Sequence, residues 1–218
     1  MTSPLQILDW GLIRYDDALK DQEEILEQVA EHRAPQTLIF CRHPSVVTTG
    51  RATLEEDLQG WQGDLIAVTR GGRATYHGPG QVVLYPILDL RLERAKLPSR
   101  DIRRYLQFLG DTAAASLNKF KLFNPVEFRQ GETVNGQHLT GLWIGEKKVG
   151  SIGVAVRKWI TYHGLALNLE RDSGAFKGIR PCGFDSGTMA CLNDFSASKL
   201  TREMVQIQMV EDFGRALT

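Results

Sequence analysis

A glycine-rich segment of this 218-residue sequence combines residue types that suit ligand binding. The glycine-rich segment, residues 70–81, reads RGGRATYHGPGQ and is followed by the apolar run 82–86. Glycine permits positive φ and a close approach of the backbone to a ligand, whereas proline fixes φ and removes a donor. The composition predicts a backbone cradle for a substrate, with Arg70, Arg73 and His77 aimed into it. A tight glycine turn before a strand is the alternative.

A cysteine between turn formers is a candidate nucleophile. Cys182 lies in the run GIRPCGFD, with Pro181 and Gly183 on either side of it and Arg180 nearby. Such a setting exposes a thiol, and the cation lowers its pKa. Cys41 and Cys191 fit the more common pattern of a small buried apolar residue.

A nucleophilic thiol needs a basic or cationic partner in space. The candidates are His77, His163, Lys147 and Lys148. Lys147 falls in an expected turn, where a solvated surface charge is the ordinary interpretation. Lys148 opens an expected strand, and the small residues at 150, 151 and 153 leave room for a ligand beside that strand.

The tetrapeptide TYHG occurs at 75–78 and again at 161–164. The flanking residues differ, so coincidence is favoured over a domain duplication. Each copy is expected at a junction of a strand and a loop. Both copies can therefore place a histidine and a glycine against one cavity.

Composition narrows the class of protein. Lys and Arg total 26, and Asp and Glu total 26, so no net charge favours nucleic acid or a membrane surface. Three cysteines without a C-x-x-C pair argue against a disulfide framework and a zinc site, and for a reducing compartment. The N-terminus lacks the apolar region of a signal peptide, and no run approaches the ~20 apolar residues of a membrane span. We expect a soluble cytoplasmic protein without a metal or cofactor.

Helical and strand patterns alternate along the chain and must position these residues. Helices are expected at 16–31, 101–120 and 201–217, with Ser99 as the cap of the second. Strands are expected at 36–41, 64–69, 82–86, 142–144, 149–156 and 160–169, with a hairpin turn at 145–147. Because no Pro/Ser-rich linker divides the chain, residues 1–218 are expected to form one α/β-mixed (α+β) domain whose sheet is rich in antiparallel pairs.

Six separated motifs together resemble the lipoyl(octanoyl) transferase family, over about residues 10–195. In chain order they are 42–51 (RHPSVVTTGR), 70–81, 140–144 (TGLWI), 148–153 (KVGSIG), 163–168 (HGLALN) and 181–183 (PCG). Their combination is far more specific than any one motif. The chain departs from the family pattern at Met189 and Ala190, where Thr-Ser is frequent, and at Thr48, where an apolar or aromatic residue is common.

The resemblance implies a biotin/lipoate-protein ligase-like fold, a mixed sheet with mainly antiparallel pairs flanked by helices, together with a small second sheet. It also implies an activity. An octanoyl group is taken from octanoyl-acyl carrier protein and placed on a lysine of a lipoyl domain, in 2-oxoacid dehydrogenase E2 subunits or the glycine cleavage H protein. No metal, cofactor, nucleic acid or membrane is implied.

The resemblance also assigns roles to residues. Cys182 would carry the acyl group, and Lys148 would lower its pKa and later take a proton from the incoming amine. Backbone N–H groups would hold the thioester oxygen as it becomes an oxyanion, and His77 would shape the wall. The expected lining of the acyl tunnel is Arg70, Gly71, Gly72, Arg73, Ala74, Thr75, Tyr76, His77, Ser151, Ile152, Gly153, Gly164, Leu165 and Ala166.

Two other functions stay open on the sequence. An ATP-dependent lipoate- or biotin-protein ligase would share the fold but form an acyl-adenylate, without need of a nucleophilic cysteine. A non-catalytic acyl-binding module would need the cavity but neither Cys182 nor Lys148. If an acidic carrier protein docks, the candidate contacts are Arg70, Arg73, Arg157, Lys158, Lys177 and Arg180.

Overall fold

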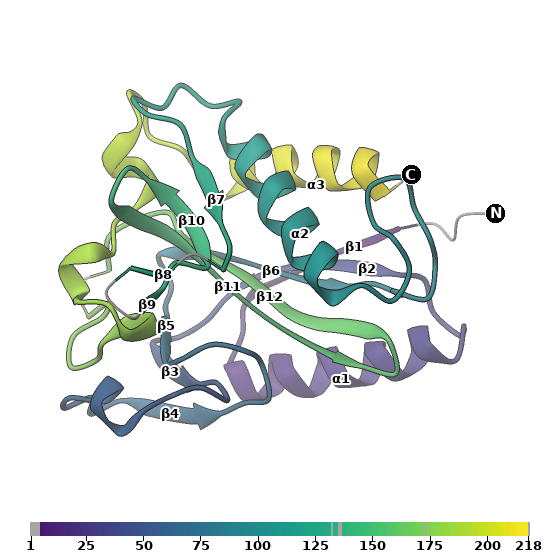
Figure 1. Ribbon diagram of the computed structural model, residues 1–218, viewed down its shortest axis with the longest axis horizontal. Helices are drawn as coiled ribbons and strands as arrows, with labels where there is room; N and C mark the ends of the chain where they lie inside the picture. Colours follow the sequence, from purple (N-terminus) through teal and green to yellow (C-terminus); the bar gives the residue numbers. More distant parts are fainter. Residues whose placement is uncertain (1–4, 132, 135–136, 173, 218) are drawn as a thin grey trace.

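The computed structural model describes residues 5–131, 133–134, 137–172 and 174–217. Its main sheet carries helices on both faces, with α1 (Tyr15–Ala30) on one face and α2 (Ile102–Leu117) and α3 (Arg202–Leu217) on the other (Figure 1). In spatial order the strands of this sheet are β1 (Gln6–Leu12), β2 (Thr37–Arg42), β6 (Gln81–Ile87), β12 (Ile160–Asn168), β11 (Lys147–Arg157), β10 (Gly141–Ile144) and β7 (Glu127–Arg129).

The pairing of these strands is mixed. Strands β1 and β2 are parallel, while the successive pairs from β2 through β6, β12, β11 and β10 to β7 are antiparallel. The predicted mixed sheet with mainly antiparallel pairs and flanking helices is therefore confirmed. The described helices include none that is long and apolar enough to cross a membrane.

The helices are held by apolar residues at helical spacing. Ala18, Leu26 and Val29 of α1 are buried, and Leu26 and Val29 pack in one apolar cluster with the sheet face that carries Ile39 and Val83. On the opposite face α2 and α3 contact each other, with the rings of Phe108 and Phe213 edge to face at 6.0 Å between centroids. All three predicted helices are present, with ends that shift by a few residues.

The cap of α2 differs from the prediction. Asp101, not Ser99, precedes the helix, and its carboxylate accepts the backbone N–H of Arg104 at 2.9 Å. Asp101 is the residue directly before the helical backbone, where a side-chain oxygen can reach an unpaired N–H of the first turn. Ser99 lies too far upstream for that bond.

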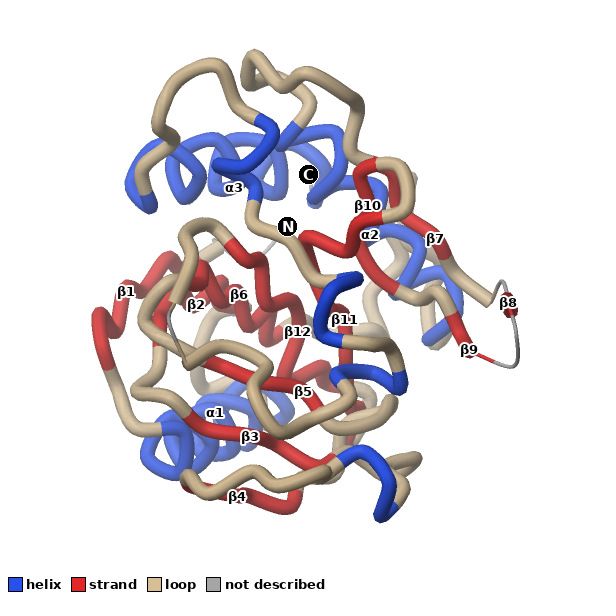
Figure 2. Tube along the Cα trace, turned by 90° about the vertical axis from the view of Figure 1, so that its left-hand side faces the viewer, coloured by secondary structure: helices blue, strands red, loops and turns tan. Residues whose placement is uncertain are grey.

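A small sheet has the order β4 (Asp64–Ala67), β3 (Val46–Thr49) and β5 (Thr75–His77). It lies on the side of the molecule that carries α1, away from α3 (Figure 2). Strand β5 falls inside the glycine-rich segment, for which no strand is evident from the sequence. The pair β8 (Thr133–Val134) and β9 (Gln137–His138) and the short 3-10 helices η1 (Glu55–Asp57), η2 (Pro181–Gly183), η3 (Ser186–Thr188) and η4 (Leu192–Phe195) complete the elements.

Candidate active site

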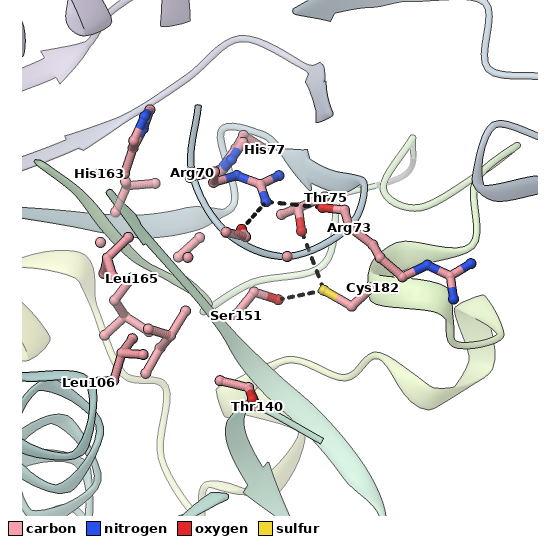
Figure 3. Close-up of a pocket in the computed structure, with 18 of the residues that line it drawn as sticks. Arg70, Arg73, Thr75, His77, Leu106, Thr140, Ser151, His163, Leu165 and Cys182 are labelled. Carbon is pink, nitrogen blue, oxygen red and sulfur yellow. Dashed lines mark hydrogen bonds between the residues drawn. The ribbon is translucent and has the colours of Figure 1, made fainter. Parts of the chain in front are cut away.

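A cavity of about 450 Å³ lies between the glycine-rich segment, strands β11 and β12, and the loop that carries Cys182 (Figure 3). Both predicted catalytic residues, Cys182 and Lys148, line it. Twelve of the fourteen residues predicted to line the acyl tunnel also do so: Arg70, Gly71, Gly72, Arg73, Thr75, His77, Ser151, Ile152, Gly153, Gly164, Leu165 and Ala166. The topology therefore brings segments about 110 residues apart in the chain to one space.

The glycine-rich segment wraps around the side chain of its own Arg70. The guanidinium donates from Nη1 to the carbonyl oxygens of Gly71 and Arg73, each at 3.0 Å, and from Nη2 to the carbonyl and hydroxyl oxygens of Thr48, at 3.0 and 2.7 Å. The Gly71 N–H donates to the carbonyl of Val154 in β11 at 3.0 Å. Arg70 is buried, so it is a fixed positive charge at the cavity wall rather than a surface residue.

Ala74 and Tyr76 do not line the cavity, which corrects the prediction for these two positions. Successive residues of a strand point to opposite faces, so Thr75 and His77 of β5 face the cavity and their neighbours face away. Tyr76 packs against the rings of Trp61 and Phe176 in a separate apolar cluster. Its hydroxyl binds Ser45 and donates to the Asp172 carboxylate. Tyr76 thus fixes the back of β5.

Cys182 lies in η2 and adopts a left-handed backbone conformation, with φ of 55°. Its N–H donates to the carbonyl of Ala74 at 2.8 Å, which ties the loop to the residue just before β5. The sulfur lies 3.4 Å from the Thr75 hydroxyl and 3.7 Å from the Ser151 hydroxyl (Figure 3). A left-handed conformation is costly for a residue with a side chain, so it persists only where surrounding contacts enforce it.

The electrostatics of the site favour a thiolate. Burial alone raises the pKa of Cys182, but the positive charge of Lys148, the hydroxyls of Thr75 and Ser151, and the charge of Arg70 outweigh it. The pKa of Cys182 is therefore lowered from its ordinary value. Burial raises the pKa of Cys41, and burial with the nearby Asp194 raises that of Cys191 to about 11. Of the three cysteines, Cys182 alone lines the cavity and has a lowered pKa.

Lys148 is 1% exposed, which is rare for a lysine. Its Nζ lies 5.4 Å from the ring centroid of Phe184 and 5.7 Å from that of Trp143. None of the ion pairs between described residues involves Lys148 or Arg70. The cavity thus carries two buried cations, a distribution that stabilises an anion placed between them.

The chain after Cys182 is fastened to β11 beside Lys148. The Ala190 N–H donates to the Lys148 carbonyl at 3.0 Å, and Lys147 Nζ donates to the Gly187 carbonyl at 2.7 Å. Gly141 of the neighbouring strand makes room for the lysine, because a Cβ there would lie 2.6 Å from Lys148 Cε. The backbone bond between Ala190 and Lys148 thus keeps the chain that follows the nucleophile beside the lysine.

Several lining residues are absent from the prediction. Tyr15 begins α1, Tyr85 lies in β6, and Ile102 and Leu106 lie on α2. Their positions depend on how the helices cross the sheet, which local patterns do not encode. The repeat of TYHG was a usable signal, because His77 and His163 both reach the cavity although their flanks differ.

The predicted docking cations fall into different environments. Arg70 is buried and bound by its own loop, so it cannot meet a docking protein. Arg157 and Lys158 pair with Glu23 and Glu27 of α1, and Arg73 and Arg180 lie beside Glu56. Lys177 is exposed. Arg51, which the prediction left out, is exposed and lines the cavity.

The chain matches a protein-family model and is similar in sequence to curated proteins. The family model of the lipoyl protein ligase A/B catalytic domain matches residues 14–214. An octanoyltransferase of Bdellovibrio bacteriovorus is 44% identical over 196 residues, which cover 88% of this chain and 89% of that protein.

Solved structures share the fold at low sequence identity. A bipartite lipoate protein ligase from Thermoplasma acidophilum has a TM-score of 0.67 at 18% identity, over 99% of this chain and 84% of that chain. The biotin protein ligase of Aquifex aeolicus has a TM-score of 0.51 at 11% identity, over 100% of this chain and 70% of that chain. The predicted lipoate-protein ligase-like fold is confirmed by this likeness.

Proposed function

The chain belongs to the octanoyltransferase family and contains its lipoyl protein ligase A/B catalytic domain, and we propose that it carries the octanoyl group as a thioester on Cys182. The chain is an acyltransferase, and octanoyl transfer in lipoate biosynthesis is its activity. The proposed donor is octanoyl-acyl carrier protein. The proposed acceptor is a lysine of a lipoyl domain, as in 2-oxoacid dehydrogenase E2 subunits and the glycine cleavage H protein. One observation carries the proposal: the only cavity-lining cysteine also has a lowered pKa beside a buried lysine.

In the first half of the reaction, the Cys182 thiolate attacks the carbonyl carbon of the donor thioester. A new C–S bond forms to Cys182, and the C–S bond to the donor thiol breaks. The Lys148 ammonium gives its proton to the departing thiolate and becomes a neutral amine. Exchange between two thioesters is nearly balanced in energy, so lowering the barrier is the main task of the site.

In the second half, the acceptor lysine amine attacks the acyl carbon on Cys182. The neutral Lys148 amine takes the proton that the attacking nitrogen loses, and the Cys182 thiolate leaves. A stable amide replaces a reactive thioester, so this half runs downhill. Both groups return to their starting states, an ammonium and a thiolate, without any further reactant.

Negative charge on the acyl oxygen must be stabilised in both halves. The Cys182 N–H is taken by the Ala74 carbonyl, so this amide is not free to serve as an oxyanion donor. The hydroxyls of Thr75 and Ser151 lie beside the sulfur, and Lys148 lines the same cavity. We assign the oxyanion to this corner, where hydroxyl donors and a buried cation converge.

The apolar part of the cavity suits the acyl chain. Ile152, Leu165, Ala166 and Val83 line it, together with Gly153 and Gly164, which carry no side chain. Burying the seven carbons beyond the octanoyl carbonyl is worth about 6 kcal/mol, at ~0.8 kcal/mol for each. Chain length therefore matters to binding.

The choice of donor separates this proposal from an ATP-dependent ligase. Wild-type protein is mixed with a lipoyl domain and either octanoyl-acyl carrier protein alone or octanoate with ATP. We expect acylation of the lipoyl domain from the thioester without ATP. Acylation that requires ATP and the free acid would identify a ligase. Binding of the acyl donor without any acylation would identify a non-catalytic acyl-binding module.

A further inference from the structure

Polar side chains gather at the end of the cavity remote from the nucleophile. His163 lies across the pocket from Cys182, with Arg70 between them (Figure 3). Tyr15 and His77 line the same cavity, and their rings lie 5.2 Å apart. An acyl chain attached to Cys182 that extends toward His163 would meet this end with its methyl terminus.

His163 Nδ1 lies 3.2 Å from the Tyr15 hydroxyl, but the other three imidazole nitrogens at this end have no hydrogen-bond partner among the described residues. They are Nδ1 and Nε2 of His77 and Nε2 of His163. His77 is 6% exposed and His163 is 1% exposed, so bulk water does not satisfy them. Buried polar atoms are rarely left unpaired, because the loss of hydration is then uncompensated.

A third buried histidine in the same cluster shows the contrast. His43 has its Nδ1 2.8 Å from the Ile13 carbonyl and its Nε2 2.8 Å from the Tyr85 hydroxyl. His43 does not line the cavity. The unpaired nitrogens thus belong to the two histidines that line the cavity, not to buried histidines of this fold in general.

The surroundings favour the neutral form of both cavity histidines. Burial and the charge of Arg70 lower the pKa of His163 to about 3, and burial, with His43 and Arg70, lowers that of His77 well below its ordinary value. A neutral imidazole offers one N–H donor and one acceptor lone pair. Such a pair of rings can donate to and accept from an uncharged hydrogen-bonding group.

We propose that the His77–His163 end of the cavity is a hydrogen-bonding subsite that limits the length of the acyl chain. This inference rests on the proposed function. Water or an uncharged polar group at the subsite satisfies the free nitrogens. The methylenes of a chain longer than octanoyl displace that partner and leave the nitrogens buried and unpaired. Each carbon that packs against the apolar walls adds to the binding free energy. A carbon that reaches this polar end adds nothing, because it leaves the nitrogens without a partner.

Donors of equal length test the subsite on the wild-type enzyme. The kcat/KM of decanoyl-pantetheine is compared with that of 10-hydroxydecanoyl-pantetheine, with a lipoyl domain as acceptor. We expect the hydroxylated chain to be faster by about tenfold, since its hydroxyl can bond to the imidazoles. In a purely apolar tunnel a buried hydroxyl is costly, so a slower hydroxylated donor would overturn the proposal.

A histidine variant with a matched control tests the residue. His163→Leu removes the free nitrogen and should raise the decanoyl-to-octanoyl ratio of kcat/KM about tenfold, whereas His163→Gln, which keeps hydrogen-bonding groups, should keep the ratio low. His32→Leu is the control, because His32 is exposed and has φ of 57°, close to the 55° of His163. An unchanged ratio in His163→Leu would contradict the subsite but not the proposed function. Absence of octanoyl transfer in the wild type would instead contradict the proposed function.

Discussion

At the scale of single residues, the site is organised around a thiol between two buried cations. Lys148 and Arg70 both favour the anionic form of Cys182, while burial opposes it. The guanidinium of Arg70 donates to backbone and Thr48 oxygens, so it acts on Cys182 through its charge. Lys148 packs on aromatic rings, which leaves its ammonium available for proton transfer.

Lys148→Met tests the role of the lysine. Removing the cation should raise the pKa of Cys182, because the largest factor that lowers it is lost. The alkylation rate of Cys182 by iodoacetamide rises as pH passes through that pKa, so the curve should move to higher pH. Octanoyl transfer should fall at least about a hundredfold, the usual scale of a lost acid–base group.

The matched control for that variant is Lys147→Met. Lys147 is exposed and lies one residue away on the other side of β11. In Lys147→Met, the pH dependence of Cys182 alkylation should stay as in the wild type. An unmoved curve in Lys148→Met would contradict the assigned role of the lysine.

Single residues were predictable where their neighbours in sequence decide their environment. Cys182, between Pro181 and Gly183, differs visibly from Cys41 in an apolar strand. Ala74 and Tyr76 were assigned to the wrong side because β5 was not recognised as a strand, and alternation decides which residues face the cavity. Tyr15 reaches the cavity only through the packing of α1.

At the scale of elements, Asp57 of η1 links the glycine-rich segment to the nucleophile loop. The buried Asp57 carboxylate accepts from Arg73 Nε at 2.9 Å and Nη2 at 2.5 Å. The Asp57 carbonyl accepts the Arg180 N–H at 2.9 Å. The Arg73 guanidinium lies so close to Gly183 that a Cβ there would need it to shift. The pair therefore braces the turn that holds Cys182.

Asp57→Ala should loosen that turn. We expect the free energy of unfolding to fall by about 2–3 kcal/mol, because the partly buried Arg73 loses its partner. Octanoyl transfer should fall with it. The control is Glu56→Ala, which removes an exposed partner of Arg73 and should cost no more than about 1 kcal/mol. Urea unfolding measures the free energy of unfolding, and the transfer assay measures the activity. Equal losses in Asp57→Ala and Glu56→Ala would contradict the bracing role.

The contact of β12 with β6 also depends on a missing side chain. A Cβ at Gly164 would overlap the backbone carbonyl of Leu84, which cannot move without separating the strands. Gly164→Ala should therefore lower the free energy of unfolding by about 3 kcal/mol. Gly214→Ala, in α3 with no atom within 4 Å of the added Cβ, should instead raise it by about 0.5–1 kcal/mol. Urea unfolding measures both changes. A change in the free energy of unfolding in the same direction for the two variants would contradict this account.

Elements were predictable where periodicity is long and regular. The helical stripes and the strands that became β2, β6, β11 and β12 were found, although the strand expected at 64–69 ends at Ala67. The missed strands are short or half exposed, as in β1 at the edge of the sheet and β5 in the glycine-rich segment. In such strands the apolar alternation is too brief or too weak to detect.

At the scale of the whole molecule, charge is balanced, so any attraction of an acidic donor protein must be local. Arg51 is exposed at the cavity lining, where a carrier protein would deliver its thioester. Arg51→Glu should lower kcat/KM for octanoyl-acyl carrier protein about tenfold at low salt and leave octanoyl-pantetheine nearly unaffected. Lys20→Glu, on exposed α1 surface, is the control. An equal loss with both donors in Arg51→Glu would contradict docking at this residue.

The architecture as a whole was predictable from the six motifs together. They identify a family, and the family implies the mixed sheet and the small second sheet that are observed. The single domain over residues 1–218 stays a prediction. The paired environment of Arg157 and Lys158 was out of reach, because it depends on how α1 packs beside the β11–β12 hairpin.

The central claim is that the octanoyl group passes through Cys182, and intact-mass measurement tests it most directly. Wild-type protein is incubated with octanoyl-acyl carrier protein in the absence of acceptor. We predict that the protein gains one octanoyl group, that Cys182→Ser gains none, and that Cys41→Ser gains it as the wild type does. Loss of the adduct in Cys41→Ser with its retention in Cys182→Ser would contradict the account.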